Sequence, residues 1–253
     1  MISILCPKME EKMSKTLAIY GAGGLGREAL ELARQINVKE QRWKDFMFVI
    51  DGEGGTTVNG VEVFSYNDLK KKNKQDVEVA FGIGEPAIKE KLLKKVRTDG
   101  WETPTLIHPE VYIPSTTSVG EGVVIQKYAF ISCNVLIEND VYIQPHTNIG
   151  HDCVLKTGSM LSGFCNLAGE VSIGKYAFLG ISSCVKEHVS VGDYAIVSMA
   201  SAVYKDIEDG VVAVGNPARV MKRNEEKRVF KLGGNDVKGK DGCNYRMFTG
   251  NRQ

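Results

Sequence analysis

The chain has 253 residues and a formal net charge of +1, with 43% apolar and 25% charged residues. This balance is typical of a globular protein with a buried core, and it gives no reason to expect a nucleic acid or a membrane as partner. No segment reaches the roughly 18 apolar residues of a transmembrane helix, and residues 1–15 are too charged for a signal peptide. We therefore expect a cytoplasmic protein.

Residues 15–104 alternate between strand-like and helix-like segments. Residues 15–36 predict a strand, a glycine turn and an amphipathic helix. The remaining segments are strands at 46–50 and 77–83 and lysine-rich, helix-compatible stretches at 65–73 and 86–98. Strand-helix alternation of this kind predicts a small, parallel, Rossmann-like α/β sheet.

The turn after the first strand reads Gly21-Ala22-Gly23-Gly24-Leu25-Gly26, which fits the GxGxxG pattern. Glycines let the backbone approach a phosphate, and the helix that follows offers free NH groups. Asp51 ends the next strand, where its carboxylate could accept a hydrogen bond from a sugar hydroxyl. A domain of about ninety residues is too small for a six-stranded dinucleotide sheet, so a mononucleotide or nucleotide sugar is the favoured ligand. A tight turn that binds nothing is the alternative.

A period of six residues dominates the second half of the chain. From residue 107 to 203 every sixth residue is aliphatic: Ile107, Ile113, Val119, Ile125, Ile131, Ile137, Ile143, Ile149, Leu155, Leu161, Leu167, Ile173, Leu179, Val185, Val191, Val197 and Val203. From Ile113 onward a small or β-branched residue stands two positions earlier. This period fits neither a helix nor a plain strand, and it is the hexapeptide signature of a parallel β-helix with about eighteen residues per coil.

The hexad phase fails at Asp209, although residues 211–223 still have the pattern of an ordered segment. From Gly233 onward the sequence is rich in glycine and charge, so we expect a tail that is loosely held or docked on a neighbour. The predicted units are an N-terminal extension at 1–14, an α/β domain at 15–104, a β-helix at 105–208, an ordered segment at 209–232 and a tail at 233–253.

One stretch of the solenoid carries candidate catalytic side chains. His151 and Asp152 lie between the inward positions Ile149 and Cys153, which places them at a corner of the coil. An imidazole beside a carboxylate is the minimal general-base pair. Gly169 follows His151 by one coil, so the two should stack at about 4.8 Å, and the NH of Gly169 could serve as an oxyanion donor to a thioester. A plain surface histidine is the alternative for His151.

The other histidines and the cysteines are weaker candidates. We expect His146 and His188 to point outward and His108 to be structural at the domain junction. Six cysteines occur without a CxxC pair, and no set of side chains has zinc-site spacing, so we expect reduced structural cysteines and no metal.

Three motifs in order, YGAGGLGRE, IGHDCVL and VGNPARVMKR, resemble one known family. The chain is similar, over about residues 15–223, to the bacterial sialic-acid O-acetyltransferases and nucleotide-aminosugar N-acetyltransferases. The resemblance implies a left-handed β-helix, a homotrimer with active sites between subunits, and acetyl-CoA as co-substrate without a metal.

The resemblance also assigns roles to single residues. It implies that His151 is the general base and that Asp152 orients it. The implied acetyl-CoA contacts are Gly169, Gly180, Ala202, Gly215, Asn216, Pro217, Arg219 and Lys222. The implied nucleotide-sugar contacts are Gly21, Gly23, Gly24, Leu25, Gly26, Asp51, Gly82 and Gly84. Leu25 and Met160 stand where well-known N-acetyltransferase relatives carry histidine, so the resemblance does not fix the acceptor.

The leading prediction is therefore acetyl transfer from acetyl-CoA to the amine of a nucleotide-linked aminosugar, as in the synthesis of polysaccharide precursors. O-acetylation of a sialic acid or another sugar hydroxyl is the closest alternative. A non-catalytic β-helix scaffold is the second.

Overall fold

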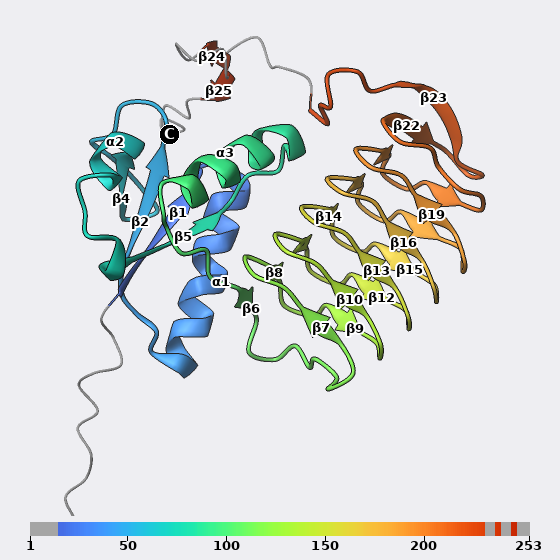
Figure 1. The fold of residues 1–253 in the computed structure, drawn as a ribbon, viewed down its shortest axis with the longest axis horizontal. Helices are drawn as coiled ribbons and strands as arrows, with labels where there is room; N and C mark the ends of the chain where they lie inside the picture. The colour runs from blue at the N-terminus through green and yellow to red at the C-terminus, as the bar shows by residue number, and fades with distance from the viewer. Residues whose placement is uncertain (1–14, 231–235, 239–243, 247–253) are drawn as a thin grey trace, which may run out of the picture.

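The computed structural model describes residues 15–230 and the backbone of two short antiparallel strands, β24 (Asp236–Lys238) and β25 (Asn244–Arg246). The predicted N-terminal extension and the rest of the predicted tail lie outside the described residues. Residues 15–230 form an α/β unit followed by a β-helix of three parallel sheets (Figure 1).

The α/β unit is built on a five-stranded sheet in the order β3-β4-β2-β1-β5, in which only the β3–β4 pair is antiparallel. Its elements are β1 (Lys15–Tyr20), α1 (Gly24–Glu40), β2 (Trp43–Ile50), β3 (Thr56–Val58), β4 (Val61–Ser65), α2 (Tyr66–Leu69), a 3-10 turn (Lys74–Asp76), β5 (Val77–Phe81) and α3 (Pro86–Thr98). The predicted α/β fold is confirmed.

The sequence reading missed two features of this unit. The helix-compatible stretch 65–73 holds only one short helix, α2, and the Asn73 side chain caps a separate 3-10 turn through the NH of Gln75. The hairpin of β3 and β4 was also missed. Its turn is Asn59-Gly60, with φ of 48° and 75°, which is the backbone that favours Asn-Gly in two-residue hairpins.

The β-helix has three faces. The domain-facing sheet contains β6 (Leu106–Ile107), β8 (Val124–Ile125), β11 (Tyr142–Ile143), β14 (Met160–Leu161), β17 (Phe178–Leu179), β20 (Ile196–Val197), β22 (Val211–Val214) and β23 (Arg219–Arg223). The second sheet contains β9 (Phe130–Ile131), β12 (Asn148–Ile149), β15 (Asn166–Leu167), β18 (Cys184–Val185) and β21 (Ala202–Val203). The third sheet contains β7 (Ser118–Val119), β10 (Leu136–Ile137), β13 (Val154–Leu155), β16 (Ser172–Ile173) and β19 (Ser190–Val191).

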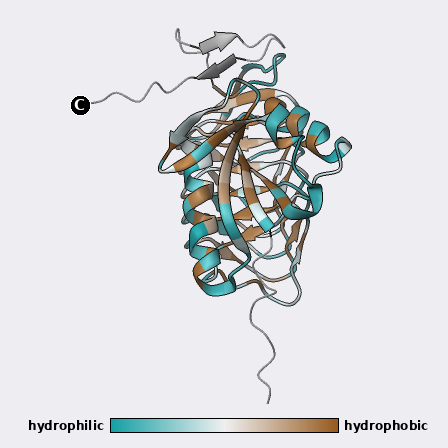
Figure 2. Ribbon diagram, turned by 90° about the vertical axis from the view of Figure 1, so that its left-hand side faces the viewer, coloured by the Kyte–Doolittle hydropathy of each residue, from teal (hydrophilic) through white to brown (hydrophobic). Residues whose placement is uncertain are grey.

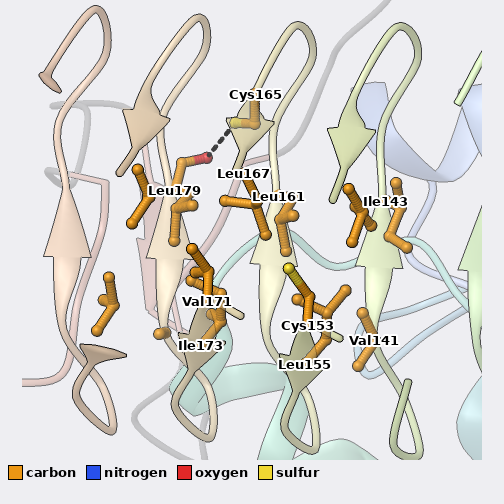
Figure 3. Close-up of a cluster of buried hydrophobic side chains, with 14 of the residues drawn as sticks. Val141, Ile143, Cys153, Leu155, Leu161, Cys165, Leu167, Val171, Ile173 and Leu179 are labelled. Atoms are coloured by element: carbon orange, nitrogen blue, oxygen red, sulfur yellow. Dashed lines mark hydrogen bonds between the residues drawn. The ribbon is translucent and has the colours of Figure 1, made fainter. Parts of the chain in front are cut away.

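The register confirms the predicted coil length. Leu136 pairs with Val154, and Asn148 pairs with Asn166, so each strand lies eighteen residues from its neighbour. All seventeen predicted aliphatic positions belong to one core that runs through the solenoid. Figure 3 shows this core, where the thiol of Cys165 points to the carbonyl of Leu179 and Cys153 packs beside Leu155. Cys153 and Cys165 are fully buried in this core, where a thiol serves as a compact apolar filler.

Each corner of the solenoid contains one residue in the left-handed backbone region. Positive φ recurs every sixth residue from Gly122 to Ala200, with values between 54° and 72°. This repeated turn bends the chain from one sheet to the next. Asp152 is one of these corner residues.

The solenoid continues past the point where the predicted phase ends. Ile207 pairs with Val191, only sixteen residues earlier, so the last coil is two residues shorter than the others. The side chain of Asp209 then accepts a hydrogen bond from the backbone of Asp193 at 2.7 Å. β22 adds to the domain-facing sheet beside β20, and β23 returns antiparallel to β22.

The α/β unit packs on the outward side chains of the domain-facing sheet. Val124, Tyr142, Met160, Phe178 and Ile196 share one buried cluster with apolar residues of α1, β1 and β2. Figure 2, seen from the α/β end, shows hydrophobic colour along the strands of its sheet and both colours on its helices. Within the described part of the chain, no helix is long and apolar enough to cross a membrane.

A charged contact reinforces this junction. Arg97 of α3 donates two hydrogen bonds to the carboxylate of Asp140, at 2.6 and 2.8 Å, and Lys89 bonds to the carbonyl of the same residue. Asp140 is buried, so the bidentate pair satisfies a carboxylate that would otherwise be costly to bury. The α/β unit is therefore fixed to one face of the solenoid.

Candidate functional site

His151 and Asp152 lie at the corner between β12 of the second sheet and β13 of the third. The Nδ1 atom of His151 is 2.7 Å from an Asp152 carboxylate oxygen, and both side chains are exposed. Asn134, one coil earlier, donates a hydrogen bond of 3.0 Å to the other carboxylate oxygen. The sequence analysis did not predict Asn134. The signal was present, because Asn134 lies eighteen residues from Asp152, the same offset that located Gly169 from His151.

The protonation state of this pair follows from the chemistry of the contact. Hydrogen bonds from His151 and then from Asn134 hold the pKa of the Asp152 carboxyl below its usual range. The group is therefore an ionised acceptor at neutral pH, and Nδ1 of His151 must be the donor. The opposite nitrogen, Nε2, is then without a proton in the neutral imidazole. A histidine held in this way can accept a proton.

Gly169 provides the space that the imidazole occupies. A Cβ atom at Gly169 would lie 2.5 Å from both Nε2 and Cε1 of His151, so any side chain there would displace the ring. The backbone carbonyl of His151 accepts a hydrogen bond of 2.8 Å from the NH of Glu170, which fixes the stacking of the two coils. Within residues 15–230, no acceptor is found for the NH of Gly169, so this NH is available to donate to a ligand.

The predicted glycine turn connects β1 to α1, and its glycines fall into two groups. A Cβ atom at Gly26 would lie 1.8 Å from the carbonyl oxygen of Gly21, and one at Gly82 would lie 2.2 Å from Cα of Gly26. These glycines allow α1 to pack tightly against the sheet. Gly23 and Gly24, in contrast, have open space where a side chain would begin. Open space at the beginning of a helix is where a ligand phosphate could approach.

Two helix N-termini meet at this edge of the sheet, because α1 and α3 follow the adjacent parallel strands β1 and β5. Neither helix has an acidic residue in its first turn or a side-chain cap on its N-terminus. The N-terminus of α1 therefore presents positive partial charge that no carboxylate in its cap or first turn offsets, whereas α3 has Glu85 at its N-cap. Asp51 is already engaged at this edge, by the hydroxyl of Tyr20 at 2.6 Å and by Lys95 at 2.5 Å.

The C-terminal residues of the predicted acetyl-CoA set form a second group. Ala202 bonds through its backbone to Gly215 and Ala218, at 3.0 and 2.8 Å, so this loop closes over the last coil. Arg219 and Lys222 are exposed on β23. A groove of about 750 Å³ lies between the domain-facing sheet and the chain that follows β23, and its lining includes Gly180 and Lys222.

These groups are not all adjacent within one chain. His151 and Gly169 lie at the corner between the second and third sheets, whereas Gly180 lies between β17 of the domain-facing sheet and β18 of the second sheet. The glycine turn and Gly84 lie on the α/β unit, where Leu25 and Met160 approach each other. Within a single chain, the parts of the predicted site therefore lie at different corners of the solenoid and on the α/β unit.

The remaining histidines match their predicted placement. His146 and His188 are exposed. His108 is buried, with Nε2 2.8 Å from Gln35 and Nδ1 accepting from the NH of Glu110, as expected for a structural residue. Among the described residues, no group of three His, Cys, Asp or Glu side chains is arranged to hold a metal ion.

Comparison with known proteins gives matches over both parts of the chain. Residues 16–96 match the PglD N-terminal domain. GDP-perosamine N-acetyltransferase of Escherichia coli O157:H7 is 29% identical over 173 residues, which cover 68% of this chain and 78% of that protein.

Solved structures give the same result. The acetyltransferase domain of PglB from Neisseria gonorrhoeae FA1090, in complex with acetyl coenzyme A, has a TM-score of 0.76 and 25% identity over 82% of this chain and 100% of that one. PerB from Caulobacter crescentus, in complex with CoA and GDP-perosamine, has a TM-score of 0.75 and 28% identity over 81% of this chain and 97% of that one. These matches and the two-part fold confirm the resemblance that the motifs indicated: the chain is similar to nucleotide-aminosugar acetyltransferases, and it combines an α/β unit with a left-handed β-helix.

Proposed function

We propose that the protein transfers an acetyl group from acetyl-CoA to the amine of a nucleotide-linked aminosugar, with His151 as general base. The observation that carries this proposal is the His151–Asp152 pair, in which Nδ1 donates to the carboxylate and Nε2 lies over Gly169. The relatives support the reaction class, since one is named a GDP-perosamine N-acetyltransferase and another binds acetyl coenzyme A.

The chemistry follows from this geometry. The neutral amine attacks the thioester carbonyl carbon, and the new C–N bond forms as a proton passes from the amine to Nε2 of His151. The negative charge on the carbonyl oxygen is stabilised by the NH of Gly169. The C–S bond then breaks, and the protonated imidazole returns its proton to the thiolate of CoA. Asp152 holds the ring and balances its charge during the step.

The donor would extend along the solenoid from Gly169 toward Gly180, Ala202 and the loop of Gly215, Asn216 and Pro217. The side chains of Arg219 and Lys222 supply cations for its phosphates. The acceptor would bind at the other unit, with its diphosphate at the open glycines of the Gly21–Gly26 turn. Gly84, which follows β5, would form the floor of this pocket, and Gly82 would let Gly26 pack closely beneath it.

We also propose that the protein is a homotrimer with active sites between subunits, and the separation of these groups supports this assembly. Because His151 and Gly180 lie at different corners of the solenoid and more than one coil apart, a neighbouring subunit would complete the path of the donor. An exposed row of stacked rings, Tyr128, His146 and Phe164, runs along the corner that also carries Ile181 and Met199. Exposed apolar surface of this extent is typical of a subunit interface. We also propose a cytoplasmic location, where acetyl-CoA and nucleotide sugars are available.

The proposal is tested by measuring CoA release with acetyl-CoA and a panel of GDP-, UDP- and dTDP-linked aminosugars. Turnover with at least one of them, and tight binding of the matching nucleoside diphosphate by calorimetry, are expected. Turnover with free sialic acid and no nucleotide binding would instead favour O-acetylation of a sugar hydroxyl. Failure to bind acetyl-CoA would favour a non-catalytic scaffold.

A further inference from the structure

The segment Asn224–Phe230 follows β23 and returns from the end of the solenoid to the α/β unit. It is held at several points along its length. The NH of Asn224 bonds to the carbonyl of Gly210 at 2.7 Å, and the ammonium of Lys227 lies 3.6 Å from the ring centroid of Tyr194. The motifs shared with the family end at about residue 223, so this segment is a feature of this chain rather than of the motifs.

Glu85 makes the firmest of these attachments. One of its carboxylate oxygens accepts from the NH of Val229 at 2.8 Å, and the other accepts from the NH of Phe230 at 3.2 Å. Glu85 is only 9% exposed, and burial raises the pKa of its carboxyl while the two NH donors act in the opposite direction. A buried carboxylate is costly unless it is hydrogen-bonded. Both oxygens of Glu85 are used to fix the backbone at the end of this segment.

The ring of Phe230 is thereby placed at the predicted nucleotide-sugar pocket. It packs edge-on against Phe178, with ring centroids 5.7 Å apart. The position of a Cβ atom on Gly84 lies 3.5 Å from Phe230, 3.7 Å from Leu25 and 3.9 Å from Met160, so the three side chains surround one point. Phe230 nevertheless remains 55% exposed. An aromatic face that is anchored on one side and bare on the other is suited to pack against a ligand.

Phe230 also lines the groove of about 750 Å³ that contains Gly180 and Lys222. It therefore lies between the residues predicted for the nucleotide sugar and those predicted for acetyl-CoA. A sugar whose diphosphate sits at the N-terminus of α1 would extend past Gly84 toward this ring. Phe178, Leu25 and Met160 lie beside the ring and the Glu85 carboxylate is engaged by backbone NH groups, so the surface next to Phe230 at Gly84 is apolar.

We propose that the segment Asn224–Phe230 is a wall of the acceptor site, in which Phe230 packs against the sugar of the nucleotide sugar and Glu85 is the positioning residue that holds it. This inference rests on the proposed function and adds a part of the binding site that the family motifs do not contain. The wall acts on acceptor binding, not on proton transfer, because Phe230 carries no titratable group.

The test compares Phe230→Ala with Tyr112→Ala, a truncation of another exposed ring at the far end of the solenoid. Steady-state kinetics should show a rise of roughly tenfold to a hundredfold in the KM for the nucleotide-aminosugar, as expected for loss of a buried aromatic contact. The KM for acetyl-CoA and kcat should stay within about twofold of wild type. Tyr112→Ala should change neither KM, and Phe230→Tyr should restore the acceptor KM.

Glu85→Gln separates positioning from direct contact. A glutamine has one acceptor oxygen and can satisfy only one of the two NH groups, so the acceptor KM should rise by roughly threefold to tenfold. The double variant of Glu85→Gln and Phe230→Ala should be no worse than Phe230→Ala, because both changes act through the same ring. Independent, multiplying effects would contradict the role of Glu85.

Three results would overturn the proposal: an unchanged acceptor KM in Phe230→Ala, a fall in that KM, or an equal rise in both KM values. A fall would identify the ring as a plug rather than a wall. The proposed function is tested separately by the wild type. If the wild type turns over none of the nucleotide-aminosugars, that function fails, and calorimetric binding of the same compounds to wild type and Phe230→Ala decides the role of the wall.

Discussion

The corner that holds His151 and the turn at Gly21–Gly26 both depend on glycine, but for different reasons. Gly169 leaves room for the imidazole of the previous coil, whereas Gly26 and Gly82 leave room for backbone. Gly23 and Gly24 have no neighbour where a side chain would begin. A glycine therefore indicates a site only where the space it leaves is open or is filled by a reacting group. Where the space is filled by backbone, the glycine serves packing.

Replacing Gly169 with alanine should have the largest kinetic effect among the changes around His151. The added Cβ would lie 2.5 Å from Nε2, so the imidazole must move, and a displacement of about 1 Å costs on the order of a hundredfold in rate. We expect kcat to fall by that factor with the melting temperature nearly unchanged. Gly163→Ala is the matched control, because its Cβ would meet only Pro145 at 3.4 Å. Equal activity of the two variants would contradict the role of Gly169.

Asp152→Asn should have the next largest effect. Asparagine tolerates the left-handed backbone of this corner, so the change removes charge without strain. It weakens a charge-assisted hydrogen bond of roughly 1.5–3 kcal/mol, which corresponds to a loss of about tenfold to a hundredfold in kcat. Kinetics at saturating substrates measure this loss. An unchanged kcat would show that the carboxylate does not orient His151.

One alanine substitution in each class of glycine in the turn should distinguish glycines needed for packing from glycines that leave space for a ligand. Gly26→Ala should lower the melting temperature, since its Cβ would lie 1.8 Å from the carbonyl of Gly21 and overpacking costs about 1–3 kcal/mol. Gly24→Ala meets no atom within 4 Å, so it should keep or slightly raise the melting temperature while raising the acceptor KM by roughly tenfold. Thermal melts and kinetics on both variants check the division. A lower melting temperature in both variants would contradict the division into packing glycines and ligand-facing glycines.

Asn134→Ala should have the smallest effect. Asn134 bonds to Asp152 and not to the ring, at an exposed position, so we expect a fall in kcat of only about twofold to fivefold. The same kinetic assay measures it. A loss as large as that of Asp152→Asn would mean that Asn134 contacts the reacting groups directly.

The two regions also differ in how far the sequence predicts them. The six-residue period fixes strand register, so counting from Ile149 locates His151 at a corner and Gly169 one coil later. The same period could not predict the shortened last coil, where Ile207 pairs with Val191, because a two-residue deletion leaves no pattern of its own. Counting by the same period does locate Asn134, which lies eighteen residues before Asp152 and therefore at the same corner one coil earlier.

In the α/β unit, the chain order of strands and helices predicts the fold, but the site depends on contacts between distant residues. Tyr20 and Lys95 hold Asp51, and neither contact follows from the spacing of the motif. The attachment of Phe230 to Glu85 joins residues 145 positions apart, and no local pattern records it. The sequence therefore predicts the catalytic corner more completely than the acceptor side.

The most direct test of the account is the turnover of His151→Ala with acetyl-CoA and an accepted nucleotide-aminosugar, measured under single-turnover conditions on a protein whose assembly state matches wild type. We predict a fall of roughly a hundredfold to ten-thousandfold in the rate of acetyl transfer, with binding of both substrates retained. A rate close to wild type in this folded variant would contradict the assignment of His151 as the base.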